Sequence, residues 1–432
     1  MAFAAVWMVS ILAAIGLATA QDAARDTSGG ESRAPTIGSI YPTGHTQSPL
    51  TPAVVQRLRR LAEHGDLDDD EFIKVGASAT VNRNFLRCFS GPRVVWGEHE
   101  ELESTRAFFD HDSGHNPFLR DSLSATVGWH AGRAIWGSPP PLVQEARDTD
   151  ARFAVVMYGT NDIELGRPHL YASLMGRLVR MLTVRGVIPV LTTIMPRDDD
   201  PDSDRYVDLY NAVVRGIAQS EQVPLIDYHR ELAALPDHGL ASDGVHPNVR
   251  FVRHHPRACE FDARGLRYGY NIRNLITLRA LDRLRRHVLD AEPAPDAPTA
   301  APRGRGSRRD PIRVDSLPFS HASDTSRSPH RDVDRYGCGD QDESGPEVVY
   351  RVEVDEPMEA YALVTNAHGV DVDLHVLRDG ACVERANEFL SLTLEPGTYD
   401  FAIDTFVGND GDARAGRYLF VLGRTDQPSD PD

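Results

Sequence analysis

The sequence is short of basic residues and, after its first 20 positions, has no long apolar run. Its 432 residues include 46 lysines and arginines against 64 aspartates and glutamates, which gives a formal net charge of −18. Nucleic acids and anionic membrane surfaces require a basic face, so the composition argues against both as partners. No stretch after residue 20 is long and apolar enough to span a bilayer. The length predicts one to three domains, and no internal repeat is visible.

The first 20 residues differ from the rest of the chain. Met1 to Ala20 is apolar almost throughout and ends in the small-x-small sequence Ala18-Thr19-Ala20. An apolar core followed by such a site is typical of a signal peptide, although the usual basic n-region is missing. The alternative is an uncleaved N-terminal anchor. Both interpretations direct the chain out of the cytosol, so we expect a signal peptide at residues 1–20 and a secreted, periplasmic or cell-surface protein.

Cysteine is scarce, and its spacing excludes a common class of metal site. The four cysteines are Cys88, Cys259, Cys338 and Cys382, with no Cys-x-x-Cys, so neither a zinc site nor a thioredoxin-type site is indicated. An even number in an exported chain predicts two disulfides, for which three pairings are possible. We favour Cys88–Cys259 and Cys338–Cys382, because each pair then stays within one predicted folded unit.

Residues 46–290 alternate between apolar runs and amphipathic segments. This alternation predicts βαβ units and therefore an α/β domain with a parallel sheet. A polar stretch at residues 21–45 precedes it and is expected to be a flexible lead-in. The predicted strands are Phe72–Val75, Phe153–Tyr158, Val187–Leu191 and Val223–Asp227, and the predicted helices are Pro52–Glu63, Gly128–Ile135, Leu170–Arg185, Tyr206–Ser220 and Leu275–Leu289.

The chain changes character after residue 290. Residues 291–335 carry Pro, Arg, Asp and Ser with little apolar content, which predicts a linker. Beyond it the apolar period becomes two, as in Val348–Val354, Val370–Val376 and Tyr399–Ile403. We therefore expect a small all-β sandwich domain at residues 336–424.

Three polar stretches of the α/β domain combine side chains that could act together. Ser78 follows a predicted strand and the turn-forming Gly76, and Asn161 follows the next strand within Gly159–Asp162. The third stretch holds Asp243 and His246, three positions apart. A histidine held by a carboxylate is the general base that a neutral serine needs, and an asparagine amide can donate to an oxyanion. Taken singly, each stretch also fits a turn, a helix cap or an incidental surface histidine.

With these residues together, the α/β domain resembles the SGNH (GDSL-type) hydrolase family over residues 68–290. Gly76-Ala77-Ser78 matches the family's serine block, Gly159–Asp162 its Gly-x-Asn-Asp block and Asp243–Pro247 its Asp-x-x-His block. Ala77 stands where the name-giving pattern has aspartate, a position without a role in proton transfer. The remaining mark, a glycine, is assigned to Gly128, with Gly132 as the runner-up.

The resemblance implies a three-layer, flavodoxin-like fold and a secreted serine ester hydrolase that needs neither metal nor cofactor. Its catalytic residues would be Ser78, Asp243 and His246. The oxyanion hole would combine the backbone N–H groups of Ser78 and Gly128 with the Asn161 side chain. The expected substrate is a small ester or an acetylated glycan. The alternative, kept open by Ala77, is a catalytically inactive surface or carbohydrate-binding protein whose β-sandwich is the binding module.

Other clusters have a more ordinary interpretation. The acidic run Asp198-Asp199-Asp200 lacks the ligand spacing of a calcium loop and is expected to be a solvated loop. His111 with His115, and the pair His254-His255, have no further metal ligands in a recognisable pattern. The β domain resembles the pre-peptidase C-terminal module of secreted bacterial proteins, with cues at Glu347–Tyr350, Val372–Val376 and Leu394–Tyr399. That resemblance implies a role in attachment or secretion, sometimes with calcium.

Overall fold

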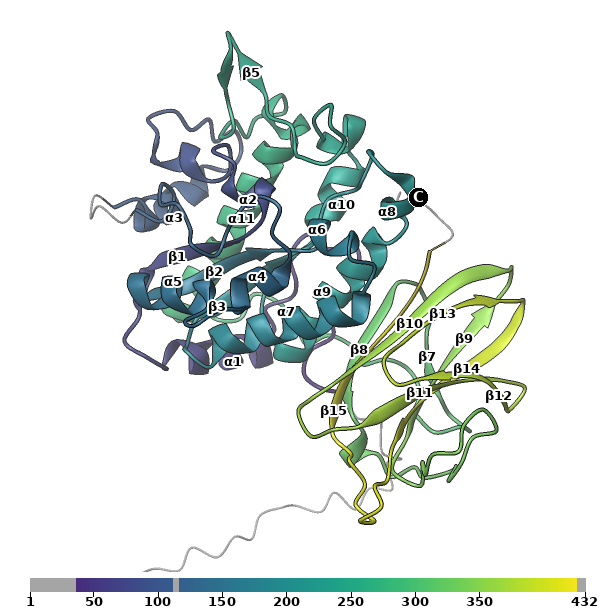
Figure 1. Cartoon of the computed structure of the whole chain (residues 1–432). Coiled ribbons are helices and arrows are strands. Elements are labelled where there is room, and N and C mark those ends of the chain that lie inside the picture. The colour runs from purple at the N-terminus through teal and green to yellow at the C-terminus, as the bar shows by residue number, and fades with distance from the viewer. Residues whose placement is uncertain (1–35, 112–115, 426–432) are drawn as a thin grey trace, which may run out of the picture. The chain divides into compact units, whose positions relative to one another are not determined.

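The computed structural model describes residues 36–111 and 116–425, and its first domain is built on a parallel sheet (Figure 1). The strands are β1 (Asp68–Gly76), β2 (Ala151–Met157), β3 (Ile188–Thr192) and β4 (Leu225–Ile226), in the order β1-β2-β3-β4. All three neighbouring pairs are parallel. β2 and β3 are buried along their whole length, as continuous apolar runs predict. The predicted α/β fold is confirmed.

The strand order explains how the helices cover the sheet. Successive strands lie side by side, and right-handed crossovers in one direction leave the connecting helices on one face. Accordingly α5 (Pro141–Thr149), α7 (Pro168–Thr183) and α9 (Val207–Glu221) pack on that face of the sheet. The opposite face is covered by α1 (Pro52–Ala62) and the final helix, α11 (Gly269–Leu284) (Figure 1). The helices are α1 (Pro52–Ala62), α2 (Ser78–Val81), α3 (Glu103–Phe109), α4 (Ala131–Ile135), α5 (Pro141–Thr149), α6 (Thr160–Ile163), α7 (Pro168–Thr183), α8 (Pro201–Asp204), α9 (Val207–Glu221), α10 (Tyr228–Ala233) and α11 (Gly269–Leu284).

Strand register brings the predicted site loops to one edge of the sheet. Gly76, the last residue of β1, pairs with Met157, the last residue of β2. The loops that carry Ser78 and Asn161 therefore leave the sheet at the same level. The carboxyl edge of an open α/β sheet is where ligands bind, so the topology itself selects this edge for the site.

The C-terminal domain is built of antiparallel strands in two sheets. One sheet has the order β13-β10-β15-β8 and the other β12-β11-β14-β9-β7, where β7 alone pairs in parallel. Side chains from both sheets form one apolar core. The strands are β7 (Ile312–Arg313), β8 (Phe319–Asp324), β9 (Val348–Val354), β10 (Met358–Asn366), β11 (Val372–Arg378), β12 (Ala381–Ala386), β13 (Phe389–Leu394), β14 (Gly397–Thr405) and β15 (Arg417–Arg424).

The predicted linker at residues 291–335 needs correction. It contains β7 and β8, and β8 pairs with β15 from Phe319↔Leu422 to Asp324↔Arg417. The β domain therefore begins well before residue 336. Earlier in the segment, Asp296 accepts a hydrogen bond from the backbone N–H of Leu50, so even its first residues are bound to the α/β domain.

The described end of the predicted lead-in is also ordered. Tyr41 is buried, and its backbone N–H donates to Gln219 Oε1 at 3.1 Å. The backbone N–H of Ser39 donates to Gln222 Oε1 at 2.7 Å. Ser39 and Tyr41 therefore pack against the end of α9 and the turn that follows it, while the backbone N–H of Ile37 donates to the carbonyl oxygen of Ala322 in β8 at 3.1 Å. The predicted signal peptide at residues 1–20 lies outside the described residues.

Both favoured disulfides are present. Cys88 bonds to Cys259 within the α/β domain, and Cys338 bonds to Cys382 within the β domain. Each link closes inside one folded unit, which is the reason this pairing was favoured. Within residues 36–111 and 116–425, no helix combines the length and the apolar character needed to cross a membrane.

Candidate active site

Ser78 sits in a tight turn between β1 and α2. β1 ends at Gly76, and Ser78 is the first residue of α2. We expected glycine here for backbone freedom, but its φ is not in the left-handed region. Glycine is required for steric reasons instead, because a Cβ on Gly76 would clash with Thr80 Oγ1 and would lie 2.6 Å from the carbonyl oxygen of Met157. Only glycine lets the β1 terminus approach α2 and β2 this closely.

Two residues of α11 donate hydrogen bonds to the turn that follows Ser78. Arg273, which is 1% exposed, donates from Nη1 to the carbonyl oxygen of Ala79 at 2.7 Å and from Nη2 to Thr80 Oγ1 at 2.9 Å. Its guanidinium lies 3.8 Å from the ring centroid of Phe85. The Tyr270 hydroxyl donates to the same carbonyl of Ala79 at 3.2 Å. Sequence reasoning assigned no role to Arg273 or Tyr270, yet they position the residue directly after Ser78.

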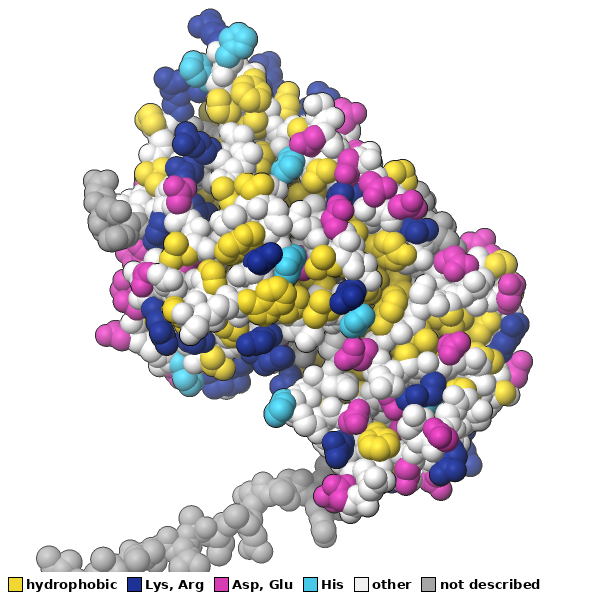
Figure 2. Space-filling view, in the orientation of Figure 1, with side chains coloured by type: hydrophobic (Ala, Val, Ile, Leu, Met, Phe, Trp, Pro, Cys, Tyr) yellow, Lys and Arg dark blue, Asp and Glu magenta, His cyan; other side chains and the backbone are white. Residues whose placement is uncertain are grey.

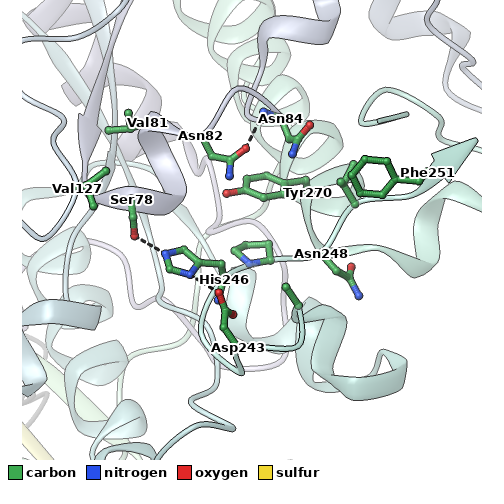
Figure 3. Close-up of a pocket in the computed structure, with 13 residues that line it drawn as sticks. Ser78, Val81, Asn82, Asn84, Val127, Asp243, His246, Asn248, Phe251 and Tyr270 are labelled. Carbon is green, nitrogen blue, oxygen red and sulfur yellow. Dashed lines mark hydrogen bonds and ion pairs between the residues drawn. The ribbon is translucent and has the colours of Figure 1, made fainter. Parts of the chain in front are cut away.

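Ser78, His246 and Asp243 form a continuous hydrogen-bonded chain (Figure 3). Ser78 Oγ is 2.7 Å from His246 Nε2, and His246 Nδ1 is 2.8 Å from Asp243 Oδ2. The other oxygen of Asp243 accepts the backbone N–H groups of Val245 and His246, each at 3.0 Å. Partial burial raises the pKa of Asp243, but the hydrogen bonds from His246 and Val245 outweigh it and hold that pKa below its ordinary value. The carboxylate thus stays ionised while it orients the imidazole.

The acidic loop at Asp198-Asp199-Asp200 supports the histidine loop. The backbone N–H of Asp198 donates to the carbonyl oxygen of Gly244 at 2.9 Å. Gly244 has φ +68°, and a Cβ there would lie 2.6 Å from the backbone nitrogen of Asp199. Arg197 donates to both oxygens of Asp199, which lowers the pKa of that carboxyl. No group of metal-ligating side chains includes this loop within the described residues, and its charges serve local packing.

Asn161 anchors the loop that carries Gly128. The Asn161 side-chain amide donates from Nδ2 to the carbonyl oxygen of Trp129 at 2.9 Å. Gly128, the residue before Trp129, is exposed and has φ +75°, a conformation that favours glycine. The runner-up Gly132 is buried in α4, and its backbone N–H donates to His130 Nδ1 at 3.2 Å. Gly128 therefore fits the glycine position better than Gly132.

Asp162 fixes the same loop from inside the domain. It is 1% exposed, and its carboxylate accepts the backbone N–H of Ala131 at 3.0 and 3.2 Å. Burial raises the pKa of Asp162 to about 7, against hydrogen bonds from the backbone of Ala131 and Gly159 that lower it. The Gly-x-Asn-Asp block thus holds the Gly128 loop through two adjacent side chains.

The raised pKa of Asp162 predicts a pH-dependent stability. Between its unfolded value near 4 and about 7, the folded state binds an additional proton at this carboxyl. The free energy of unfolding must therefore fall as pH rises through this range, by at most about 1.4 kcal/mol per pH unit from this residue. Asp162→Asn should remove that part of the slope in urea unfolding measured at about pH 5 and about pH 8. Equal slopes for Asp162→Asn and the parent would contradict the assignment.

The hydrogen-bonded chain opens into a cavity of about 530 Å³ (Figure 3). Ser78, Asp243 and His246 line it, as do Val127 and Phe251, which remain 66% and 63% exposed. Uncharged polar side chains also contribute to the lining: Asn82, Asn84, Asn248 and Tyr270. The lining therefore combines the hydrogen-bonded chain with apolar and amide side chains.

Residues 113–253 match the family model for the GDSL-like lipase/acylhydrolase family. The matched segment begins after the Ser78 turn and includes Gly128, Asn161, Asp243 and His246. The α/β domain is a GDSL-like lipase/acylhydrolase (SGNH) domain. The C-terminal part resembles the pre-peptidase C-terminal domain in structure. No curated protein matches the chain.

Several solved structures resemble parts of this chain. A GDSL-like lipase from Bacteroides thetaiotaomicron is 12% identical, with a TM-score of 0.33, and the match covers 53% of this chain and 98% of that one. A catalytic mutant of an acetylxylan esterase from Geobacillus stearothermophilus is 15% identical, with a TM-score of 0.33, over 49% of this chain and 93% of that one. The pre-peptidase C-terminal domain of a collagenase from Bacillus anthracis is 15% identical, with a TM-score of 0.18, over 26% and 91%.

The histidine pairs of the GDSL-like domain lie away from Ser78. His111 Nε2 is 3.3 Å from Glu71 Oε1, whereas its predicted partner His115 lies outside the described residues. His254 and His255 are exposed on the short hairpin formed by β5 (Phe251–Val252) and β6 (His255–Pro256). Neither pair belongs to a metal-ligating cluster of the described part of the chain.

Proposed function

We propose that this protein is an exported serine ester hydrolase that works through an acyl-serine intermediate. The observation that carries the proposal is the unbroken chain from Ser78 Oγ through His246 to Asp243, with contacts of 2.7 and 2.8 Å. Nucleophile, base and orienting acid come from two loops that meet over the carboxyl edge of the sheet. This arrangement suits acyl transfer from an ester to water.

In the first step Ser78 Oγ attacks the ester carbonyl carbon while His246 Nε2 accepts its proton. Asp243 holds the Nδ1–H tautomer and stabilises the imidazolium that forms. When the tetrahedral intermediate collapses, His246 returns the proton to the leaving alcohol. Water then attacks the acyl-serine in the same way, with His246 again as base, and the acid product leaves with Ser78 restored.

The negative oxygen of the intermediate requires donors that are already in position. We assign this role to the backbone N–H groups of Ser78 and Gly128 and to Nδ2 of Asn161. The second hydrogen of the Asn161 amide is engaged by Trp129, so the amide cannot rotate away when the site is empty. Donors fixed before the reaction cost no reorganisation in the transition state.

This assignment predicts a specific loss in Asn161→Ala. Its kcat should fall about 10²–10³-fold, while KM changes little, because the amide acts on charge that develops in the transition state. Asn84→Ala is the matched control, since it removes an amide that lines the cavity beside Ser78 and has no assigned contact with the oxyanion. Steady-state kinetics on p-nitrophenyl acetate measure both. A KM effect without a kcat effect in Asn161→Ala would contradict the role.

The cavity favours small acyl groups attached to polar alcohols. Val127 lies beside Ser78, whereas the amides of Asn82, Asn84 and Asn248 and the ring of Phe251 lie farther along the cavity (Figure 3). Figure 2 shows basic and histidine side chains gathered over the β5 end of the molecule. Amide and cationic groups suit the hydroxyls of a sugar better than a long lipid chain. We therefore propose a small ester or an acetylated glycan as substrate.

The direct test is turnover of p-nitrophenyl acetate compared with p-nitrophenyl esters of longer acids. We expect the acetate ester to be hydrolysed and kcat/KM to fall as the acyl chain lengthens. No turnover of any ester would favour the alternative, an inactive protein that binds through its β domain. Ala77 does not support that alternative, because it caps α2 without any side-chain hydrogen bond and no proton passes through it.

Export is supported by the two disulfides. Both link cysteines within a folded domain, and stable disulfides form in oxidising compartments. We therefore propose that the protein acts outside the cytosol, where acetylated polysaccharides are accessible. Expression with and without residues 1–20, followed by fractionation, measures this directly, and export without those residues would overturn the assigned signal.

A further inference from the structure

Three buried side chains of the β domain converge beside β11. Asp373 and His375 belong to β11, and Glu343 comes from the segment that precedes β9. One potential ligand atom from each lies within 4.8 Å of the other two. His375 Nε2 is 3.4 Å from Glu343 Oε1, and both side chains are 1% exposed. The cluster thus joins a long loop to the sheet at a point from which solvent is excluded.

The cluster holds more buried polar atoms than its neighbours satisfy. Both oxygens of Glu343, both ring nitrogens of His375 and Oδ1 of Asp373 lack a well-formed hydrogen bond, although the carboxyls of Glu343 and Asp373 are close enough to interact with each other. Buried polar atoms are normally paired, and each unpaired one costs about 1–3 kcal/mol. Five such atoms on three adjacent side chains indicate a missing partner common to all three.

The charges around the cluster favour a cation as that partner. Arg385 donates to Asp373 Oδ2 at 2.9 Å, and no ion pair of the described residues joins it to Glu343. The carboxyls of Glu347 and Asp404 both lie within hydrogen-bond distance of the Tyr336 hydroxyl, which can donate to one of them at a time. None of these three groups brings a positive charge to the cluster.

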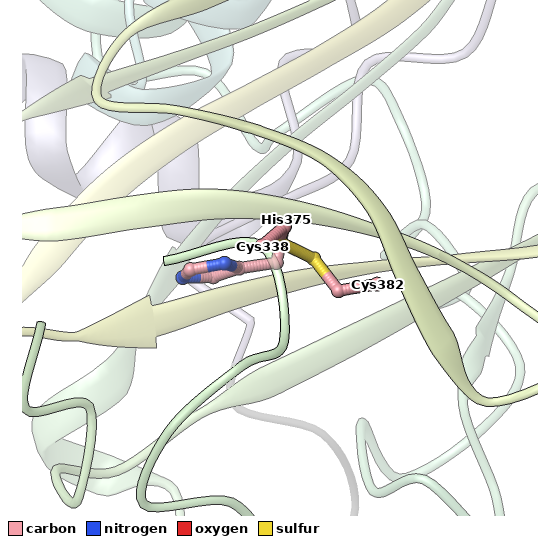
Figure 4. Close-up of side chains that lie close together, drawn as sticks. All are labelled: Cys338, His375 and Cys382. Atoms are coloured by element: carbon pink, nitrogen blue, oxygen red, sulfur yellow. A yellow bond between two sulfur atoms is a disulfide. The ribbon is translucent and has the colours of Figure 1, made fainter. Parts of the chain in front are cut away.

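The imidazole is held in place on both sides. The Tyr336 ring stacks on His375 with centroids 3.8 Å apart and an interplanar angle of 11°. The Cys338–Cys382 disulfide lies next to it (Figure 4). Because both sulfurs are in the disulfide, they offer no thiolate ligand. They fix the ring instead, which leaves His375 preorganised for one partner.

The donor set differs from the one that calcium requires. Ca²⁺ takes six to eight oxygen ligands, whereas this cluster combines one imidazole with two carboxylates. Imidazole and carboxylate together suit Zn²⁺ and related transition metals. Tetrahedral ligands about 2.0–2.1 Å from such an ion lie about 3.3 Å apart, close to the 3.4 Å between His375 Nε2 and Glu343 Oε1.

We propose that Glu343, Asp373 and His375 bind one divalent transition-metal ion of the zinc type. The ion neutralises the two carboxylates and satisfies the imidazole. It also ties the segment before β9 to β11, so its role is structural and independent of ester hydrolysis. Calcium, which the fold family implies, does not fit this set of donors.

The test uses the untagged full-length protein after treatment with a chelator. Isothermal titration with ZnCl₂ and with CaCl₂ should give one tight site for zinc and none of comparable affinity for calcium. At free zinc about 100 times the Kd, the unfolding equilibrium should shift about 100-fold toward the folded state. Co²⁺ should produce visible absorption bands of a four-coordinate N/O site. A tight calcium site that zinc does not displace would overturn the proposal.

Variants identify the site. His375→Gln and Glu343→Gln should each weaken zinc binding by more than about 100-fold, because loss of an outer partner of a ligand already costs about 10–100-fold. The exposed His368→Gln is the matched control and should bind normally. Replacing His254 and His255 together by Gln should also leave the tight site intact. Unchanged binding in both Glu343→Gln and His375→Gln, or loss of binding in the His254/His255 variant, would contradict the proposal.

Discussion

Ser78→Ala is expected to lose ester hydrolysis almost completely. The substitution removes the only atom that attacks the carbonyl carbon in the proposed mechanism, and His246 alone cannot replace it. Removing a triad serine typically lowers kcat by about 10⁶-fold, which would leave p-nitrophenyl acetate turnover at the background rate. The side chain is small and partly exposed, and among the residues that the structure describes Ser78 Oγ bonds to His246 alone. Thermal unfolding should therefore be nearly unchanged.

Ser104→Ala provides the control for the Ser78 variant. Ser104 is an exposed serine of α3, and its loss should leave kcat and KM at the parent values. The comparison separates a lost nucleophile from a general effect of removing a hydroxyl. Turnover by Ser78→Ala at a rate comparable to that of Ser104→Ala would exclude the serine mechanism.

Asp243→Asn is expected to lower kcat by about 10⁴-fold with little change in KM. The carboxylate accepts a hydrogen bond from His246 Nδ1–H and two more from backbone N–H groups of its own loop. An asparagine can keep one backbone contact, but its amide can present a donor to Nδ1. His246 would then adopt the tautomer that carries its proton on Nε2, where it cannot accept the proton of Ser78.

The control for this variant is Asp202→Asn, which removes an exposed carboxylate of α8 and should leave kcat unchanged. A kcat near the parent value in Asp243→Asn would show that His246 does not depend on this residue.

The parallel sheet can be predicted from the sequence because strands that are buried on both faces are continuous apolar runs. Continuous apolar runs such as Phe153–Tyr158 are long enough to recognise, and amphipathic helices separate them. β8 shows the opposite case. Its segment contains Ser320, His321 and Ser323, and His321 is buried only because Tyr350 and Thr36 satisfy its ring nitrogens. A polar strand that is stabilised by distant partners looks like a linker in the sequence, and for that reason the prediction for residues 291–335 was wrong.

The site was predictable where function depends on short local motifs. The Asp-x-x-His spacing lets Asp243 reach both the imidazole and the backbone of the same turn, so the motif carries its own geometry. Arg273 has no such signature. It acts across 194 positions on Ala79, and it precedes Leu275, where the predicted helix begins, whereas α11 begins at Gly269. The three side chains near β11 were missed for the same reason, since Glu343 lies 30 positions away from Asp373.

The central claim is that Ser78 is the nucleophile, and covalent labelling tests it most directly. A fluorophosphonate phosphonylates an activated serine hydroxyl with loss of fluoride, and peptide mapping by mass spectrometry then identifies the modified residue. We predict one label per chain, on the peptide that carries Ser78, with loss of ester hydrolysis in proportion to labelling and no label in the His246→Ala variant. Hydrolysis that persists in fully labelled protein, or a label on another residue that abolishes activity, would contradict the account.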